Sequence, residues 1–422
     1  MNHTQIAPGA YITALPGEKF KRCKVAIRMV LPGRRETASA LALLPNLLNR
    51  RCAAIADPIA LSRHLYNLYG AEIASESFTV GANRVVTIGV SGLKNAYALE
   101  GENLEAEYTR LACRLLFEPV AQNGAFDAED VAIEKEKQAE YLKSEINEKR
   151  LYCLQQARRK LYGASPLGLE SSGYLEDIDG LTPQSLYSAY QTLLQQAQFE
   201  ITVFGMPAEA AAQQITEYLA RVQRAPAEPL PASPAEGKPA LMQYAEAMDT
   251  IQGKLCIMLT SGKIPSAHEA AVMRVAGAIL GGLPSSRLFM NVREKQSLCY
   301  YCASSYSAFG GTLTIDSGVE HKNLRLAADA IMKELHTLQT ELATDEEIAV
   351  AKLALQGAFT TAQDSPGALE SWAFTEIMRG TGLTMQQFAQ MVQQVTKQEV
   401  QAALAAFTPA VEYAIVQKEA GK

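Results

Sequence analysis

One short stretch, VREKQSLCYY at residues 292–301, combines residue types that could hold a polar ligand. Arg293 carries a guanidinium, whose forked N–H donors suit carbonyl and carboxylate oxygens. Tyr300 and Tyr301 carry phenols, which can donate to a carbonyl or to a developing oxyanion. The same residues also fit an ordinary surface helix end followed by a core strand. A ligand-binding interpretation therefore needs support from the rest of the chain.

The histidines argue against a helical zinc site. The chain has five of them, and no two have the i, i+4 spacing that places two imidazoles on one helix face. Cys299 and Cys302 form a C-x-x-C pair, but residues three apart on a strand point to opposite faces. We therefore expect no metal ligand on this chain and no metal or redox role for this cysteine pair.

A run of glutamates could suggest paired carboxylates for acid–base chemistry. These residues share one predicted helix with several lysines, which is typical of a solvated charged face. We therefore expect no catalytic role for Glu134, Glu136, Glu140, Glu145 and Glu148.

Short strands and longer helices must position these residues. Alternating and β-branched patterns predict strands at 23–31, 73–80, 84–93, 254–262, 298–308 and 311–319. Helical periodicity is strongest at 37–51, 58–69, 103–117, 127–163 and 266–281, with further long helices up to about residue 365. Strand hairpins mixed with helix pairs predict an α+β fold, in which mixed or antiparallel sheets are covered by helices.

The two halves of the chain resemble each other. AEDVAIEK at 128–135 and DEEIAVAK at 345–352 each begin a helix, with an offset of 217 residues. A helix started by a threonine and followed by a strand occurs at 181–205 and again at 395–417, with an offset of 214 residues. Nearly constant offsets in the same order indicate a duplicated domain.

A proline-rich segment separates the halves. RAPAEPLPASPAEGKPA at 224–240 has few large apolar residues and is typical of an extended linker. We therefore predict an N-terminal domain at 1–223, a linker at 224–240 and a C-terminal domain at 241–422.

Composition excludes several classes of partner. The 422 residues include 39 basic and 45 acidic ones, mixed along the chain with a net charge of -6, so we expect no nucleic-acid partner. No leader pattern and no apolar stretch of membrane-spanning length occurs, which predicts a soluble, cytoplasmic protein without a membrane partner. The seven scattered cysteines are expected to be free thiols.

The segment GGLPSSRLFMNVREKQSLCYYCASS at 281–305 resembles the C-terminal-domain signature of the pitrilysin/insulinase metallopeptidases, the inverzincins. The resemblance implies two duplicated α+β domains, joined by a linker and arranged as a clam shell around a peptide. It also implies that Arg293 and Tyr300 hold the backbone of the substrate. Tyr301, the next residue, is kept as a further substrate-binding candidate, although a neighbour on a strand should point the other way.

The zinc motif of that family, His-x-x-Glu-His, is missing where the resemblance places it. Its positions hold Ala42, Pro45 and Asn46. A more distant glutamate ligand would fall on the 127–163 helix, where an ungapped match gives Lys143 and leaves Glu140 and Glu145 out of register. The resemblance therefore implies no zinc and no other cofactor on this chain. The alternative, an active zinc enzyme that uses other ligands, stays open.

Small bacterial members of the family often work as pairs, in which one subunit carries zinc and the other carries the arginine and tyrosine. The chain resembles the second kind, a non-zinc, substrate-binding subunit that is not catalytic alone and completes a zinc-bearing partner to cleave peptides. The alternative is a catalytically inactive peptide-binding or scaffold protein of the same fold. A homodimer of the isolated chain is a further possibility.

Overall fold

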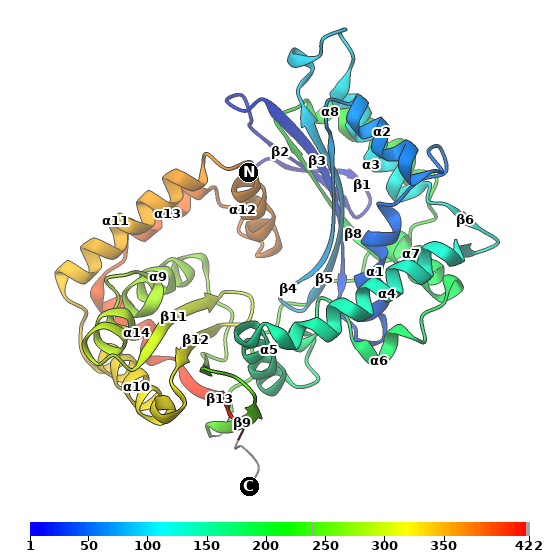
Figure 1. The fold of residues 1–422 in the computed structure, drawn as a ribbon. Coiled ribbons are helices and arrows are strands. Elements are labelled where there is room, and N and C mark those ends of the chain that lie inside the picture. Colours follow the sequence, from blue (N-terminus) through cyan, green and yellow to red (C-terminus); the bar gives the residue numbers. More distant parts are fainter. Residues whose placement is uncertain (239, 419–422) are drawn as a thin grey trace. The chain divides into compact units, whose positions relative to one another are not determined.

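The computed structural model describes residues 1–238 and 240–418, which form two compact units (Figure 1). Unit 1 contains Met1–Lys143, Leu169–Pro231 and Ser365–Gly382. Unit 2 contains Ser144–Gly168, Ala232–Asp364 and Leu383–Lys422. Each half of the chain therefore contributes one segment to the unit that the other half mainly builds.

Unit 1 is built on a six-stranded sheet. Only the β2–β8 pair is parallel, and the other neighbours are antiparallel. In spatial order the strands are β1 (His3–Ala7), β2 (Ala10–Leu15), β8 (Gln198–Phe204), β3 (Arg22–Pro32), β5 (Asn83–Leu93) and β4 (Glu72–Val80).

Helices cover one face of this sheet and bury its main core. Val25, Ile27 and Met29 alternate along β3 and point into that core. The helices of unit 1 are α1 (Arg35–Leu48), α2 (Pro58–Asn67), α3 (Leu104–Phe117), α4 (Ala128–Ser144), α6 (Leu175–Ile178), α7 (Pro183–Gln196), α8 (Ala208–Leu219) and α12 (Pro366–Met378), and a short hairpin joins β6 (Ala121–Gln122) to β7 (Ala125–Phe126).

Helix α12 reaches unit 1 from the second half of the chain and packs on the other face of the sheet. Its Phe374 contacts Val30 and Val85 in a small apolar cluster. Its Glu370 is buried and binds Arg28, and its other carboxylate oxygen lies 2.7 Å from Lys24 Nζ. Since β3 offers both cations on that face, α12 is fixed by apolar and charged contacts together.

Unit 2 repeats the same sheet plan with five strands. The spatial order β11 (Cys299–Ser307), β12 (Thr312–Val319), β10 (Gly253–Thr260), β13 (Thr408–Gln417), β9 (Met242–Met248) corresponds to β4-β5-β3-β8-β2 of unit 1. In both orders the last pair is parallel and the others are antiparallel. The shared topology agrees with the duplication that the sequence predicts, and it makes β11 the counterpart of the edge strand β4.

Helices also cover the unit 2 sheet. Cys153, Ala157 and Leu161 lie on one side of α5 and are buried against Cys256 and Met258 of β10. The helices of unit 2 are α5 (Lys149–Tyr162), α9 (Ala267–Gly277), α10 (Leu324–Thr340), α11 (Asp345–Ala362), α13 (Met385–Gln394) and α14 (Lys397–Ala405), with π-helical turns η4 (Ala278–Gly282) and η5 (Leu288–Lys295).

The predicted single helix over 127–163 is wrong. It is two helices, α4 and α5, separated by a 3-10 turn at Glu145–Asn147. The physical reason is that α4 packs in unit 1 whereas the apolar side of α5 is buried in unit 2. The prediction of an α+β fold with two helix-covered mixed sheets is confirmed. The boundaries 1–223, 224–240 and 241–422 stay a prediction about duplicated halves, as does the clam-shell arrangement.

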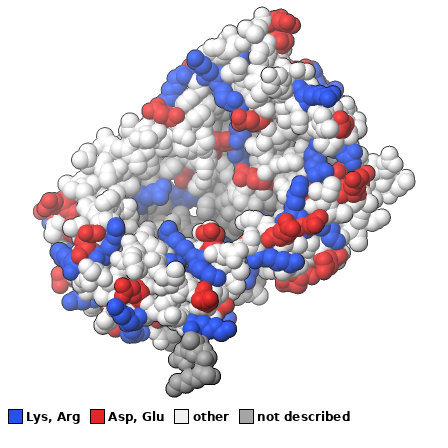
Figure 2. Space-filling model, in the orientation of Figure 1, with Lys and Arg blue, Asp and Glu red and all other residues white. Residues whose placement is uncertain are grey.

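No helix within residues 1–238 and 240–418 is long and apolar enough to cross a membrane. Acidic and basic side chains are interspersed on the face of the molecule shown in Figure 2. This surface agrees with the nearly balanced numbers of the two kinds of charge in the sequence.

Candidate functional site

The positions of the missing zinc motif lie on α1. Ala42 and Pro45 are buried, and Asn46 is partly exposed. Pro45 sits inside the helix, where it has no backbone N–H and no side-chain base. Among the residues that the structure describes, no group of three or more His, Cys, Asp or Glu is placed to hold a metal ion. These side chains therefore do not fit a zinc centre.

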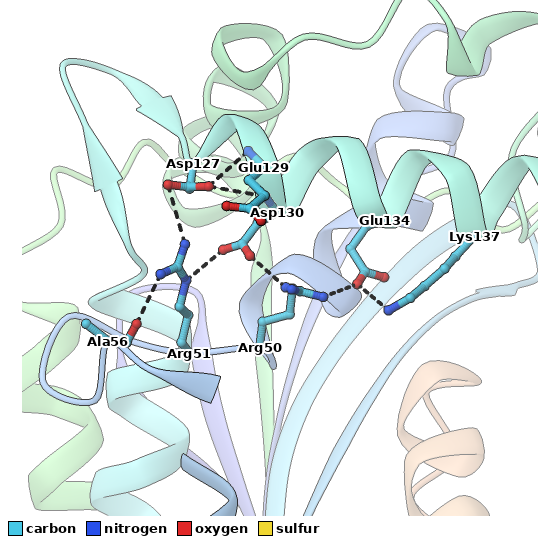
Figure 3. A network of polar contacts seen from close by, with 8 residues as sticks. All are labelled: Arg50, Arg51, Ala56, Asp127, Glu129, Asp130, Glu134 and Lys137. Carbon is cyan, nitrogen blue, oxygen red and sulfur yellow. Dashed lines mark hydrogen bonds and ion pairs between the residues drawn. The ribbon is translucent and has the colours of Figure 1, made fainter. Parts of the chain in front are cut away.

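A cluster of ion pairs joins the end of α1 to α4 (Figure 3). Arg50 Nε lies 2.8 Å from Asp130 Oδ1, and Arg50 Nη1 lies 2.7 Å from Glu134 Oε1. Arg51 Nε lies 2.7 Å from the other oxygen of Asp130, and Lys137 Nζ lies 2.8 Å from Glu134. We call Arg50, Arg51, Asp130 and Glu134 the α1–α4 cluster.

In the α1–α4 cluster, the carboxylates of Asp130 and Glu134 are paired with arginine side chains. Burial acts to lower the pKa of Arg50, but hydrogen bonds to Glu134 and Asp130 outweigh it and raise the pKa above its usual value. Glu134 is only 4% exposed, so the prediction of a solvated face is wrong for this residue, while Glu136, Glu140 and Glu148 are exposed. The sequence did contain a signal for the α1–α4 cluster. Asp130 and Glu134 are spaced i, i+4 early in α4, and Arg50 and Arg51 come directly after α1.

Arg293 is carried by η5 in unit 2. Leu288 and Val292 are fully buried and fix the turn, and π-helical turns of this kind are frequent at functional sites. The Arg293 side chain is 38% exposed; its Nε lies 3.6 Å from Glu294, and its guanidinium lies over the Phe289 ring at 4.5 Å. A loose ion pair and one ring contact leave donors of this guanidinium available to a ligand.

Tyr300 lies on β11, the first strand of the unit 2 sheet. The register with β12 shifts between Cys299 and Tyr301, so Tyr300 is the extra residue of a β-bulge. It is 51% exposed. The pKa of the nearby Glu320 is lowered first by Lys322 and also by this tyrosine. Bulges commonly redirect a side chain, and here the result is an accessible phenol on an edge strand.

Tyr301 points to the other face of the sheet. It pairs with Gly318, where an added Cβ would lie 2.4 Å from the tyrosine ring. The Arg150 guanidinium lies over this ring at 4.6 Å and is itself bound to Asp316 at 2.5 Å. Burial, followed by the charge of Asp316, raises the pKa of Tyr301. Of the two neighbouring phenols, Tyr300 is therefore the more accessible.

The same bulge brings Cys299 and Cys302 to one face of β11. Cys299 pairs with Val319 and Cys302 pairs with Ser317, and these two partners are two residues apart on β12. Residues two apart share a face of a strand, so their partners do as well. The expectation that this pair points to opposite faces is wrong, because one extra residue between the two cysteines resets the alternation.

Comparisons with known proteins show what the chain is similar to. Residues 180–355 match the family model described as "Peptidase M16 inactive domain". The chain is 24% identical over 383 residues to a Bacillus subtilis (strain 168) protein named "Probable inactive metalloprotease YmfF", covering 91% of this chain and 90% of that protein. It is 31% identical over 120 residues to "Uncharacterized zinc protease YmxG" of the same organism, which is 28% of this chain and 29% of that protein.

The fold is shared with solved structures. A conserved protein from Enterococcus faecalis V583 has a TM-score of 0.91 and 25% identity, with 100% of this chain and 99% of that one covered. The whole length of the chain, and not only its signature segment, thus has the architecture of these proteins. The chain is therefore similar, in its 180–355 segment and in its fold, to the peptidase M16 family, the pitrilysin/insulinase family that its 281–305 segment resembles.

Proposed function

We propose that this protein is the non-zinc, substrate-binding subunit of a heterodimeric zinc metallopeptidase. The observation that carries the proposal is the exposure of Arg293 and Tyr300, on η5 and the edge strand β11, in a family member whose zinc-motif positions hold Ala42, Pro45 and Asn46. Such a chain has donors for a peptide, but its zinc-motif positions offer no ligand for a metal ion that could activate water.

The edge of β11 offers a way to bind an extended peptide. Among the described strands β11 has one neighbour in its sheet, β12, and we propose that its other edge pairs with an added strand. Backbone pairing of this kind gives affinity without requiring a particular peptide sequence. Arg293 precedes β11 and Tyr300 lies at the bulge near its start, so both would contact an added peptide at that end of the strand.

The two side chains have separate tasks in this proposal. The Arg293 guanidinium donates to a backbone carbonyl of the peptide and fixes its register. The Tyr300 hydroxyl donates to the carbonyl that is attacked, and its bond strengthens as negative charge develops on the oxygen. Zinc on the partner subunit supplies the activated water. Catalysis then requires both chains.

The relatives support a pair of this kind. One Bacillus subtilis strain has both a relative named as an inactive metalloprotease and a relative named as a zinc protease. We propose by analogy that a homologous subunit with an intact His-x-x-Glu-His motif is the partner, and that the complex works in the cytoplasm.

A mixing experiment tests the proposal. The purified chain, the zinc-bearing homologue and their equimolar mixture are each assayed on a fluorogenic peptide library. We expect the mixture to cleave at least ~100-fold faster than the zinc-bearing chain alone, since it alone has the transition-state donors. Equal rates for the mixture and the zinc-bearing chain would refute the proposal.

A second candidate is a peptide-binding or scaffold protein that takes part in no hydrolysis. The α1–α4 cluster favours it, because ion pairs there give the region a purely structural role. Binding of library peptides to the chain alone, without any gain in cleavage on mixing, would select this candidate.

A further inference from the structure

Cys299 and Cys302 lie on the same face of β11, opposite Val319 and Ser317, but differ in their surroundings. Cys302 is buried, whereas Cys299 is partly exposed at the start of β11. A hydrogen bond from Cys302, assisted by Ser317 and by the charge of Arg293, outweighs the effect of burial and lowers the pKa of Cys299 to about 7. The bond to Cys299 and burial raise the pKa of Cys302. One sulfur is thus prepared as a nucleophile and the other is held next to it.

The remaining five cysteines are in a different state. All of them are buried. Burial raises the pKa of Cys23, Cys113 and Cys153 to about 12, and it also raises the pKa of Cys256. Since the thiolate is the reactive form, these thiols should be inert at neutral pH. Cys299 is therefore distinguished from the other thiols by its partial exposure, and the pair is distinguished by its position on one face of the edge strand β11.

We propose that Cys299 and Cys302 form a redox-active dithiol, which a peroxide closes into a disulfide across the bulge at Tyr300. The Cys299 thiolate attacks one peroxide oxygen and the O–O bond breaks, leaving a sulfenic acid on Cys299 and hydroxide, which takes a proton to become water. Cys302 then loses its proton and attacks the Cys299 sulfur, which expels a second hydroxide as water. The two sulfurs lose two electrons and the peroxide gains two.

Closing the disulfide must change the bulge. The sulfurs have to come within about 2.05 Å of each other, and the two Cα atoms must come within about 7 Å. The strand can yield at its start, because Ser297 leaves η5 with a left-handed φ of 51° and Tyr300 is an extra residue in the ladder. A bond that closes with strain is easily reduced, so the oxidation should be reversible by thiols.

The experiment uses the full chain treated with a small excess of hydrogen peroxide at neutral pH, then alkylated and digested. Trypsin leaves both cysteines on one peptide, 296–322, because no Lys or Arg lies between Lys295 and Lys322. We expect this peptide to lose two hydrogens and to resist alkylation until dithiothreitol is added. Before oxidation, Cys299 should be alkylated roughly ten-fold or more faster than Cys153.

Two variants separate the roles of the sulfurs. In Cys302→Ser, peroxide should leave a sulfenic acid on Cys299 that dimedone traps, and in Cys299→Ser, Cys302 should stay reduced. Full alkylation of both residues after peroxide treatment of the wild-type chain would overturn the proposal, as would alkylation of Cys299 no faster than of Cys153. These wild-type readouts do not depend on the variants folding. They also need no peptide or partner, so they stand apart from the proposed peptidase function.

Discussion

The α1–α4 cluster of unit 1 and the η5–β11 segment of unit 2 both carry arginines, but they use these charges differently. Arg50 is 19% exposed and binds two carboxylates at 2.7–2.8 Å. Arg293 is 38% exposed and has one carboxylate at 3.6 Å. The first guanidinium is saturated by the protein, whereas the second keeps donors for something else.

This contrast fits the proposal that the chain has no zinc centre but offers donors to a peptide. A zinc centre requires ligands that face one point, and α1 now has an alanine, a proline and an asparagine at its motif positions. The nearby carboxylates of α4 are neutralised by arginines, so the region remains stable without a metal ion. Tyr300, by contrast, is half exposed.

The strongest test of the contrast is to remove Arg50. Arg50→Met leaves Asp130 and Glu134 with fewer cations in a largely buried setting, and we expect a loss of about 3–5 kcal/mol in the free energy of unfolding. Urea unfolding followed by circular dichroism measures it. Arg110→Met, which removes an exposed i, i+3 pair with Glu107 on α3, is the matched control and should cost less than about 1 kcal/mol. Equal losses for the two variants would show that the α1–α4 cluster is not structural.

The next largest effect is expected on peptide cleavage by the two-chain complex. Arg293→Ala or Tyr300→Phe should each lower kcat/KM roughly 30- to 1,000-fold, which corresponds to a loss of about 2–4 kcal/mol in transition-state stabilisation. The stability of the chain should be unchanged. Tyr66→Phe, at an 81% exposed position on α2, is the control for loss of a phenol and should have no effect. A complex that cleaves normally with Tyr300→Phe would remove this residue from the site.

The sequence predicts much of the fold because its signals are local. Alternating apolar residues predict β3, β5, β10 and β12, and helix starts are also visible in the sequence. The repeat predicts two similar sheets. Strands β1 and β9, at the sheet edges, and the short β2 next to β1 were missed because such strands need few β-branched residues. The placement of α5 and α12 in the opposite units could not be predicted, since it depends on long-range burial.

The candidate site was predictable in identity but not in geometry. The signature singles out Arg293 and Tyr300 without any structure. The choice between Tyr300 and Tyr301 depends on a one-residue bulge, and the bulge is defined only by the pairing of β11 with β12. The same bulge decides that Cys299 and Cys302 share a face. The rule that side chains alternate along a strand cannot reveal an extra bulge residue, because the bulge is defined only by the pairing with the neighbouring strand.

A smaller effect is expected at the start of η5. Arg287 binds Glu347 through two hydrogen bonds of 2.7 and 3.0 Å, which fixes the segment that carries Arg293. Burial acts to raise the pKa of Glu347, but Arg287 and the backbone of Thr344 outweigh it and lower the pKa. Glu347→Gln should therefore cost about 1.5 kcal/mol at neutral pH.

The pH dependence of that loss has a definite sign. A carboxyl whose pKa is lowered by folding contributes its stability fully above its unfolded pKa of about 4.3, and the contribution disappears as the pH falls through the folded value. Wild type and Glu347→Gln should thus differ in stability at neutral pH and converge in acid. Glu346→Gln, at the exposed neighbouring position, should run parallel to wild type throughout. Parallel curves for Glu347→Gln would mean that Arg287 does not fix η5 through this carboxylate.

The smallest effect is expected at Tyr301, and it sharpens the comparison most closely, since this residue is adjacent to Tyr300. Its ring lies between Gly318 and the Arg150 guanidinium on the opposite face of β11, and Tyr301→Phe keeps that ring. Cleavage by the complex should therefore change by no more than about two-fold, against the much larger loss expected for Tyr300→Phe. Assaying the two variants side by side with one peptide makes the comparison direct. Similar losses for both would mean that the bulge does not select Tyr300, and that binding of the peptide rearranges the strand.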